Sequence, residues 1–330
     1  MANYLITGGS GYIGSLVIKE LYKRAEREGD PVQVVAVVRD VNKARNVLPG
    51  RVKLIEGDIT DGSFVDTVAN NPVCGAIDYI IHCAAPTTSA YMVSNPVETA
   101  DSIVLGTRNV LEVAKRQQVK SMVYLSSMEV YGQVEDIGRT RREEELGNVA
   151  LDAPRSCYPL GKRMAEHYCH IYAKEYGVPV KIARLAQTFG VGVRTEDNRV
   201  YMQFARAAAE GKDIVLKTLG ASLGNYCAAD DAVAAVLLLL EAGTNGEVYN
   251  VVNEANTMCI RDMAQLVATE IAGGEIAVRI AVEDSAKTGY APDTQLRLSG
   301  EKLEMLGWKP TKGLVEMYRD VIGCLSDMEN

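Results

Sequence analysis

The segment Thr7–Gly14 constrains the fold of this 330-residue chain more than any other feature. It holds four glycines, and it follows a short apolar run, residues 4–6, and leads into a stretch whose apolar residues recur at helical spacing. Gly8 would allow a tight turn, Gly11 would let a pyrophosphate approach the backbone, and Gly14 would let the following helix pack closely on the strand. The N–H groups at the start of that helix would bind the phosphates. The segment predicts a dinucleotide site, and the alternative is a glycine-rich structural turn. The candidate residues are Gly8, Ser10, Gly11, Tyr12, Ile13 and Gly14.

Strand-like and helix-like segments alternate along the first 186 residues. Continuous apolar runs predict buried parallel strands, and longer segments with an apolar stripe predict helices. The alternation is typical of an α/β protein with a doubly wound parallel sheet of the Rossmann type. Beyond Gln187 the pattern is less regular. Strands are predicted at 32–38, 52–56, 79–82, 122–126, 180–184, 214–216 and 247–252, and helices at 96–117, 158–176, 198–209 and 230–241.

A second motif, Tyr158-Pro-Leu-Gly-Lys162, carries the residues for proton transfer. Lys162 lies one helical turn after Tyr158, so its ammonium group would favour the phenolate form. Tyr158 could then take the proton of a substrate hydroxyl while a hydride leaves the same carbon. Ser127, at the end of an apolar strand, would hydrogen-bond that hydroxyl and the developing carbonyl. With the glycine loop, this set predicts a nicotinamide-dependent redox enzyme. The alternative is a helix-start tyrosine followed by a solvated lysine.

Six motifs give the chain a resemblance to the extended short-chain dehydrogenase/reductase superfamily, in its nucleotide-sugar epimerase/dehydratase branch. The resemblance implies a Rossmann domain over residues 1–186, to which 226–252 returns. It also implies a smaller C-terminal α/β substrate-binding lobe over 187–225 and 253–330, and a homodimer formed through helices 96–117 and 158–176. The motifs are Thr7–Gly14, Gly57–Asp58, Ile81–Ala85, Ser126–Gly132, Tyr158–Lys162 and Ala183–Gly190.

The resemblance also assigns roles to single residues. Asp58 matches the residue that contacts adenine, and the alternative is a cap on the next turn. Further cofactor contacts are expected from Ile59, Ala84, Ala85 and Lys162. Substrate contacts are expected from Thr87, Ser127, Met128 and Gln187, the last standing where the family usually has asparagine.

The end of the second predicted strand bears on which nicotinamide is bound. An acidic residue there would accept the ribose hydroxyls of NAD, but the strand ends in Val38, and Arg39 follows. Arg39, helped by Lys43 or Arg45, could pair with a 2′-phosphate. This favours NADP(H). A shift of two residues would instead make Asp40 the ribose ligand and leave NAD as the alternative.

The residues after Ser127 bear on the reaction. Family dehydratases carry an aspartate and then a glutamate there, whereas this chain has Met128 and Glu129. Met128 cannot protonate a leaving hydroxyl, which counts against the usual dehydratase mechanism. Decarboxylases of the family place a serine at this position and keep the glutamate, and 4-epimerases need neither group to be ionisable. Glu129 is therefore a candidate second base, or a structural residue bonded to a backbone amide.

A second departure concerns the substrate diphosphate. Many family members carry an arginine two residues before the aromatic at Tyr226, where this chain has Gly224. Either another cation replaces it, with Arg194, Arg199 and Lys217 as candidates, or the substrate lacks that phosphate.

Composition limits the remaining possibilities. The formal net charge of −8 argues against a general nucleic-acid or membrane-surface binder. Seven scattered cysteines without a Cys-x-x-Cys pair, and no signal-peptide pattern, fit a reducing cytoplasm. His167 and His170 beside Cys169 are expected on the polar side of a helix, so no metal is predicted.

The sequence thus leads to three hypotheses. The main one is an NAD(P)-dependent nucleotide-sugar epimerase, dehydratase or decarboxylase that transiently oxidises sugar C4. The second is an NADP-dependent reductase of a ketone or aldehyde without a nucleotide. The third is a non-catalytic binding protein on the same fold, against which the Ser127, Tyr158 and Lys162 set argues.

Overall fold

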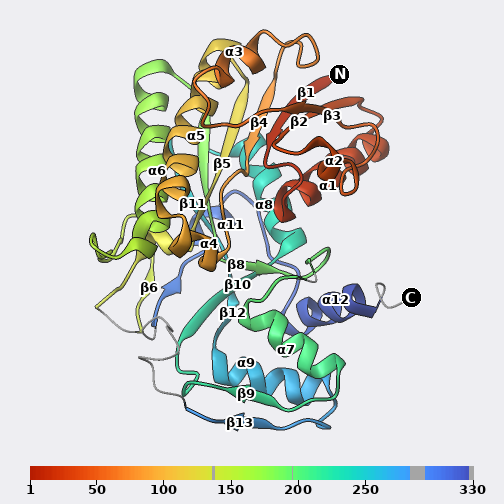
Figure 1. Cartoon of the computed structure of the whole chain (residues 1–330), viewed down its shortest axis with the longest axis vertical. Coiled ribbons are helices and arrows are strands. Elements are labelled where there is room, and N and C mark those ends of the chain that lie inside the picture. Colours follow the sequence, from red (N-terminus) through yellow and green to blue (C-terminus); the bar gives the residue numbers. More distant parts are fainter. Residues whose placement is uncertain (136–137, 195, 283–293, 327–330) are drawn as a thin grey trace.

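A seven-stranded parallel sheet forms the centre of the protein (Figure 1). The computed structural model describes residues 1–135, 138–194, 196–282 and 294–326. The strand order is β11-β7-β5-β4-β1-β2-β3, in which the chain runs from β1 to the edge at β3, returns to β4 on the other side of β1, and then continues to the edge at β11. This confirms the predicted Rossmann-type fold. The strands are β1 (Ala2–Thr7), β2 (Val32–Val38), β3 (Lys53–Glu56), β4 (Tyr79–His82), β5 (Ser121–Ser127), β7 (Val180–Leu185) and β11 (Val248–Val251).

Helices cover both faces of the sheet because neighbouring strand residues point to opposite sides. Ile6 of β1 lies in a core with α1 (Tyr12–Glu28) and α8 (Ala229–Ala242). Its neighbour Leu5 lies in a second core with α5 and α6. Leu5 and Ile6 are both fully buried, so the sheet is apolar on each face. The covering helices on the second face are α3 (Phe64–Ala69), α5 (Pro96–Gln117) and α6 (Cys157–Tyr176).

A smaller lobe lies beyond one end of the sheet (Figure 1). It holds a three-stranded sheet in the order β12-β10-β8 and a two-stranded sheet of β13 and β9. Phe189 lies at its centre, stacked on Tyr201 with ring centroids 4.3 Å apart. The elements of the lobe are β8 (Gln187–Phe189), α7 (Val200–Ala209), β9 (Ile214–Leu216), β10 (Leu223–Ala228), β12 (Asn253–Cys259), α9 (Ile260–Leu266), β13 (Val278–Ile280) and α12 (Leu314–Ser326).

The segment 226–252 divides between the two parts. β11 pairs with β7 and α8 packs on the main sheet, whereas residues 226–228 pair with β8 in the small sheet. The predicted lobe also includes 283–293 and 327–330, which lie outside the described residues. The division into domains stays a prediction.

Most predicted elements are present with shifts of one or two residues at their ends. The helix predicted at 198–209 begins at Val200, because Arg199 has extended backbone at its N-cap. Strand β13, which pairs with β9, was not predicted, because the apolar pattern there is short. His167 and His170 are exposed on α6, and the described residues hold no group of three or more potential metal-binding side chains. Within the described part of the chain, no helix is long and apolar enough to cross a membrane.

Candidate active site

The glycine loop forms a narrow cradle between β1 and α1. Gly8 has a positive φ of 68°, and a Cβ there would lie 2.7 Å from the backbone nitrogen of Ala84. A Cβ on Gly14 would lie 2.9 Å from Cα of Gly9 and closer still to the Gly8 carbonyl oxygen. Gly11 is the N-cap of α1 and offers no side chain to its first N–H groups. The loop therefore fits a dinucleotide pyrophosphate, which would bind these N–H groups.

The carboxyl end of β4 lies directly beside this loop. The backbone of Ala84 packs against Gly8. His82 is buried between the hydroxyls of Thr7 and Thr107, at 2.6 and 3.1 Å from its two ring nitrogens. Burial lowers the pKa of His82 to about 3, so the ring is neutral and cannot serve as a base that titrates near pH 7.

The other predicted cofactor residues are placed by the turn after β3. The Asp58 carboxylate accepts hydrogen bonds from the backbone N–H and the hydroxyl of Thr60, at 2.8 and 2.7 Å. Asp58 thus caps a turn, and it is also exposed at the sheet edge. Ile59 is buried, and its side chain fills the space beside Gly106 of α5.

Arg39 and Asp40 follow the end of β2, and both are exposed. Asp40 is the N-cap of the short helix α2 (Val41–Arg45), where its carboxylate accepts a hydrogen bond from the N–H of Lys43 at 2.9 Å. One of its oxygens is therefore already used locally. Arg39 is the cation closest in sequence to the strand end.

Ser127, Tyr158 and Lys162 come together at the carboxyl end of β5. Ser127 is the last residue of that strand, and its side chain lies close enough to the Tyr158 hydroxyl to lower the pKa of that phenol. Lys162 donates a hydrogen bond to the carbonyl oxygen of Leu125 at 2.7 Å, and its Nζ lies 5.8 Å from the centre of the Tyr158 ring. Tyr158 is 7% exposed and Lys162 is 3% exposed. Tyr158 and Lys162 are thus nearly shielded from water, and Ser127 is half-buried.

The protonation of this set is governed first by burial. Burial raises the pKa of Tyr158 above the usual phenol range, and the Glu129 carboxylate raises it further. The Ser127 hydrogen bond and the guanidinium groups of Arg155 and Arg199 act in the opposite direction. Burial also lowers the pKa of Lys162 to about 8. The positive charge of an oxidised nicotinamide would further favour the Tyr158 phenolate.

Glu129 is fixed by a partner that the sequence analysis missed. Nη2 of Arg155 donates to both carboxylate oxygens of Glu129, at 2.9 and 2.8 Å. Its Nε donates to the Ser89 hydroxyl at 3.0 Å, and its guanidinium carbon lies 5.6 Å from the Tyr158 ring centre. Glu129 is therefore held by a cation beside the candidate base, not by the backbone amide considered above. A basic residue three positions before Tyr158 was the available signal.

A buried ion pair between Arg184 and Glu166 contacts β5 at Ser126, the residue before Ser127. Ser126 points away from Ser127, and its hydroxyl donates to Glu166 at 2.5 Å. Glu166 in turn accepts two hydrogen bonds from Arg184, at 2.9 and 2.7 Å. Arg184 and Glu166 are 4% and 5% exposed, so this pair belongs to the interior. It holds the strand that ends in Ser127 against α6, which carries Tyr158.

Two of the three predicted substrate cations, Arg194 and Arg199, donate hydrogen bonds within the protein. Arg194 donates to the carbonyl oxygen of Ser10, which joins the lobe to the glycine loop. Arg199 donates to both carboxylate oxygens of Asp197, which also accepts from the Tyr201 hydroxyl. Lys217 directly follows β9, a strand of the smaller lobe.

The remaining predicted substrate residues lie near the end of the sheet. Gln187 is half-buried at the start of β8, opposite Tyr226. Met128 is half-buried and packs against the core that contains α1 and α8. Thr87 is exposed and lies between β4 and the short helix α4 (Ser89–Ser94). No described contact brings Thr87 to Tyr158.

Gly224 has a structural reason to lack an arginine. The ring of Tyr226, two residues on in β10, folds back over this position. A Cβ on residue 224 would lie 2.7 Å from Cε2 of that ring and closer still to Cζ and the hydroxyl oxygen. Tyr226 is fully buried and packs edge-on against Phe189, so its ring cannot move aside.

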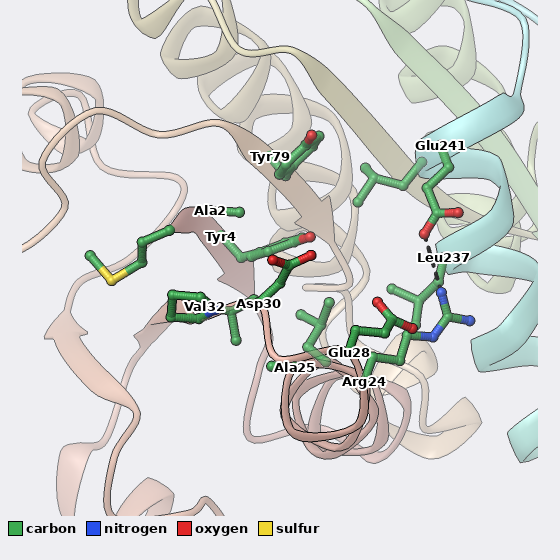
Figure 2. Close-up of a pocket in the computed structure, with 14 residues that line it drawn as sticks. Ala2, Tyr4, Arg24, Ala25, Glu28, Asp30, Val32, Tyr79, Leu237 and Glu241 are labelled. Carbon is green, nitrogen blue, oxygen red and sulfur yellow. Dashed lines mark hydrogen bonds and ion pairs between the residues drawn. The ribbon is translucent and has the colours of Figure 1, made fainter.

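A hollow of about 290 Å³ lies at the opposite end of the sheet (Figure 2). It is lined by the amino-terminal residues of β1 and by the last turn of α8. Two pairs of its side chains contact each other: Tyr4 stacks on Tyr79 at 4.9 Å, and Arg24 contacts Glu241 at 3.2 Å. It lies at the end of the sheet opposite to Tyr158, and none of the residues Ser127, Tyr158 and Lys162 lines it.

Comparisons with known proteins agree with this geometry. A sequence model of the NAD dependent epimerase/dehydratase family matches residues 4–252. The chain is 30% identical over 317 residues to UDP-glucuronic acid decarboxylase 1 of Xenopus tropicalis, which covers 94% of this chain and 69% of that protein. It is 28% identical over 312 residues to UDP-glucuronic acid decarboxylase 6 of Arabidopsis thaliana, which covers 94% and 85%.

One of the solved structures shares the fold over almost the whole chain. UDP-glucose 4-epimerase of Thermotoga maritima, solved with UDP-glucose, aligns with a TM-score of 0.83. The alignment covers 99% of this chain and all of the other, at 23% sequence identity. At this identity the comparison bears on the fold alone.

Proposed function

The chain belongs to the NAD-dependent epimerase/dehydratase family of extended short-chain dehydrogenases/reductases, and we propose that it decarboxylates a nucleotide-linked hexuronic acid. Membership in the family confirms the resemblance deduced from the six motifs. The choice of decarboxylation among the reactions of the family rests on one observation above all. Ser127, Tyr158 and Lys162 form a complete set for oxidising a carbinol carbon, while the neighbouring Met128 and Glu129 do not form an acid–base pair for expelling a hydroxyl.

The residues would act on the sugar C4 hydroxyl. Tyr158 would take its proton, Ser127 would hydrogen-bond the developing carbonyl, and Lys162 would hold positive charge beside the phenolate. The nicotinamide ring, bound with its pyrophosphate at Gly8–Gly14, would supply the hydride acceptor and later the hydride donor. Because the hydride returns to C4, the whole reaction needs no net oxidant.

Decarboxylation follows from the oxidised state of C4 without a further base. A 4-keto hexuronate is a β-keto acid, so the bond between C5 and C6 can break and release CO₂. The electron pair of that bond then moves onto the C4 oxygen, which Ser127 and Tyr158 would stabilise as an oxyanion. Protonation at C5 and reduction at C4 complete the conversion to a pentose.

The site is less suited to two other reactions of the family, 4,6-dehydration and 4-epimerisation. A 4,6-dehydratase needs a proton donor where this chain has Met128. A 4-epimerase needs the keto sugar to turn over in the site before it is reduced. The two named relatives, which match 94% of this chain, are UDP-glucuronic acid decarboxylases, which also favours loss of CO₂.

An NADP-dependent reductase remains the second candidate, on the strength of Arg39. The other argument for it, the missing arginine at Gly224, is weaker now that Tyr226 accounts for the glycine. A reductase would consume reduced cofactor in proportion to product, whereas the proposed decarboxylase would not.

The family uses a nicotinamide dinucleotide, and we propose NADP(H) as the preferred form. Arg39 is exposed at the end of β2, while Asp40 already uses one carboxylate oxygen to cap α2. An exposed guanidinium at this position suits a 2′-phosphate.

We also propose a homodimer that works in a reducing cytoplasm. Helices α5 and α6 pack side by side and leave apolar side chains exposed, among them Val97, Leu105 and Met164. The seven cysteines are all free thiols in the structure.

The deciding experiment is mass spectrometry of nucleotide sugars incubated with the protein and either NAD⁺ or NADP⁺. UDP-glucuronic acid should lose CO₂, UDP-glucose should not react, and Tyr158→Phe should abolish the change. Loss of water would identify a dehydratase, an isomer of equal mass an epimerase, and no turnover of any sugar would reject the proposal for the sugars tested.

A further inference from the structure

Arg155 and Glu129 form an ion pair at the rim of the site, next to the candidate base. Nη2 of Arg155 lies 2.9 and 2.8 Å from the two Glu129 oxygens, and its guanidinium carbon lies 5.6 Å from the Tyr158 ring centre. We propose that Arg155 is the receptor for the substrate carboxylate, and that Glu129 occupies it until a substrate takes its place. This inference rests on the proposed function, because it requires an anionic sugar.

The position of Arg155 matches the chemistry of a hexuronic acid. The carboxylate of such a sugar is attached to C5, the carbon next to C4, whose hydroxyl would meet Tyr158. A cation that binds the carboxylate must therefore lie close beside Tyr158. Arg155 precedes Tyr158 by three residues, and its charge acts directly on the Tyr158 hydroxyl.

The ion pair is of the kind that can exchange partners. The side chains of Arg155 and Glu129 are 33% and 40% exposed, and such pairs contribute little to stability because water screens them. The contacts of Arg155 use Nη2 toward Glu129 and Nε toward Ser89. A substrate carboxylate bound by two guanidinium nitrogens in parallel would have a better hydrogen-bond geometry than Glu129, whose two oxygens share the single nitrogen Nη2.

The other arginines near the site are committed elsewhere. Arg184 is buried against Glu166 and also donates to the Tyr131 hydroxyl at 3.1 Å. Arg199 is held by three contacts to Asp197, whose side chain is only 16% exposed. Arg194 donates to the carbonyl oxygen of Ser10 in the glycine loop. Arg155 is the arginine beside Tyr158 whose carboxylate partner is accessible to a ligand.

The exchange predicts opposite effects for the two partners. Removing the guanidinium should weaken the binding of a uronate and leave the binding of a neutral hexose unaffected. Removing the charge of Glu129 should strengthen uronate binding, because the competing internal carboxylate is no longer charged. If the ion pair were purely structural, changing either partner would weaken the binding of both ligands.

The test is isothermal titration of the cofactor-loaded Tyr158→Phe protein, in which turnover is blocked, with UDP-glucuronic acid and UDP-glucose. In this background Arg155→Gln should lower the affinity for UDP-glucuronic acid by about tenfold or more, and change that for UDP-glucose by less than about twofold. Arg155→Lys keeps the charge without the planar fork and should fall between the two. Glu129→Gln should raise the affinity for UDP-glucuronic acid by about threefold or more.

The outcomes separate this inference from the proposed function. Equal losses for both ligands, a weaker uronate complex in Glu129→Gln, or a parent protein that does not prefer the uronate would overturn the role of Arg155. Opposite shifts in the two variants, combined with a Tyr158-intact enzyme that releases no CO₂, would keep the receptor and reject decarboxylation. Melting temperatures of all variants show whether each one is folded.

Discussion

The ring of Tyr226 occupies the space in which residue 224 would need a Cβ, 2.7 Å from Cε2 of that ring. Both residues lie on β10, and the ring is fixed from the other side by Phe189, 5.9 Å away between centroids. An arginine at 224 is thus excluded by packing, whatever the charge of the substrate. The departure at Gly224 therefore says more about the lobe core than about the ligand.

Gly224→Ala should destabilise the protein by about 1–3 kcal/mol, the usual cost of overpacking a filled core. Urea unfolding would measure this, with Gly50→Ala as control because a Cβ there meets nothing within 4 Å. In a Tyr226→Ala background the cost should disappear, since the obstacle is gone. In a Tyr226→Phe background it should persist, because the ring carbons remain. A Gly224→Ala protein as stable as its parent would contradict the packing argument.

Glu166→Gln should cost about 3–5 kcal/mol, because it leaves the Arg184 guanidinium buried without its countercharge. The measurement is again the urea midpoint. The double variant Glu166→Leu/Arg184→Met should recover most of the loss, since an apolar pair does not leave a buried charge. Glu210→Gln, which changes an exposed pair with Lys212, is the control and should leave the midpoint unchanged. Similar midpoints for Glu166→Gln and Glu210→Gln would refute the assignment.

Local sequence patterns were sufficient to predict the sheet, the glycine loop and the Tyr158–Lys162 spacing. Each depends on residues within a few positions of one another, where periodicity and turn chemistry act. Gly8 is an example: its neighbours in sequence identify the turn, although the contact that forbids a side chain comes from Ala84. The same local logic placed β11 back on the main sheet only with help from the family resemblance.

The relationships that shape the chemistry were not predictable in this way. Arg155 and Glu129 are 26 residues apart, and no periodic sequence pattern connects the two positions. Gly224 and Tyr226 are close in sequence, but the tyrosine folds back over the glycine inside the lobe core around Phe189. Both relationships depend on tertiary packing, which a local sequence pattern does not predict.

Arg39→Ala should lower the affinity for NADP⁺ by about tenfold or more, because a charge-assisted contact with the 2′-phosphate contributes roughly 1.5–3 kcal/mol. The affinity for NAD⁺ should change by less than about twofold, and fluorescence titration would measure both. Asp40→Ala is the matched variant: it should cost about 1 kcal/mol of stability through the lost helix cap without altering the preference. The reverse pattern, with Asp40→Ala weakening NAD⁺ and Arg39→Ala without effect, would identify Asp40 as the ribose ligand.

Leu105→Glu/Met164→Glu should convert a dimer into a monomer, because it places four charges in the proposed α5–α6 interface of each pair of subunits. Both side chains are 40% exposed in the single chain, so the fold itself should tolerate the change. Sedimentation velocity at micromolar concentration is the measurement. Met305→Glu, at a residue that is 80% exposed elsewhere, should remain dimeric. A parent protein that already sediments as a monomer would count against the proposed interface.

Lys162→Met should stabilise the cofactor-free protein at neutral pH while it removes activity. Burial lowers the pKa of Lys162 from its ordinary 10.5 to about 8, so below pH 8 folding must bury a charged amine. Between pH 8 and 10.5 the unfolded chain binds a proton that the folded protein lacks, and the stability of the parent therefore rises with pH in this window. The variant should be more stable by about 1–3 kcal/mol at pH 7, allowing for the lost bond to the Leu125 carbonyl, with no advantage above pH 10.5.

Urea unfolding at pH 7, 8, 9 and 10 would measure that difference, and turnover should fall by about a hundredfold or more. Lys174→Met, at an exposed lysine on the same helix, is the control and should follow the parent at every pH. A constant difference between Lys162→Met and the parent across the series would mean that Lys162 does not titrate in this range. The Lys162 ammonium group would then be stabilised in the folded protein by interactions stronger than its hydrogen bond to Leu125. Lys162 would therefore be positively charged even before a cofactor binds.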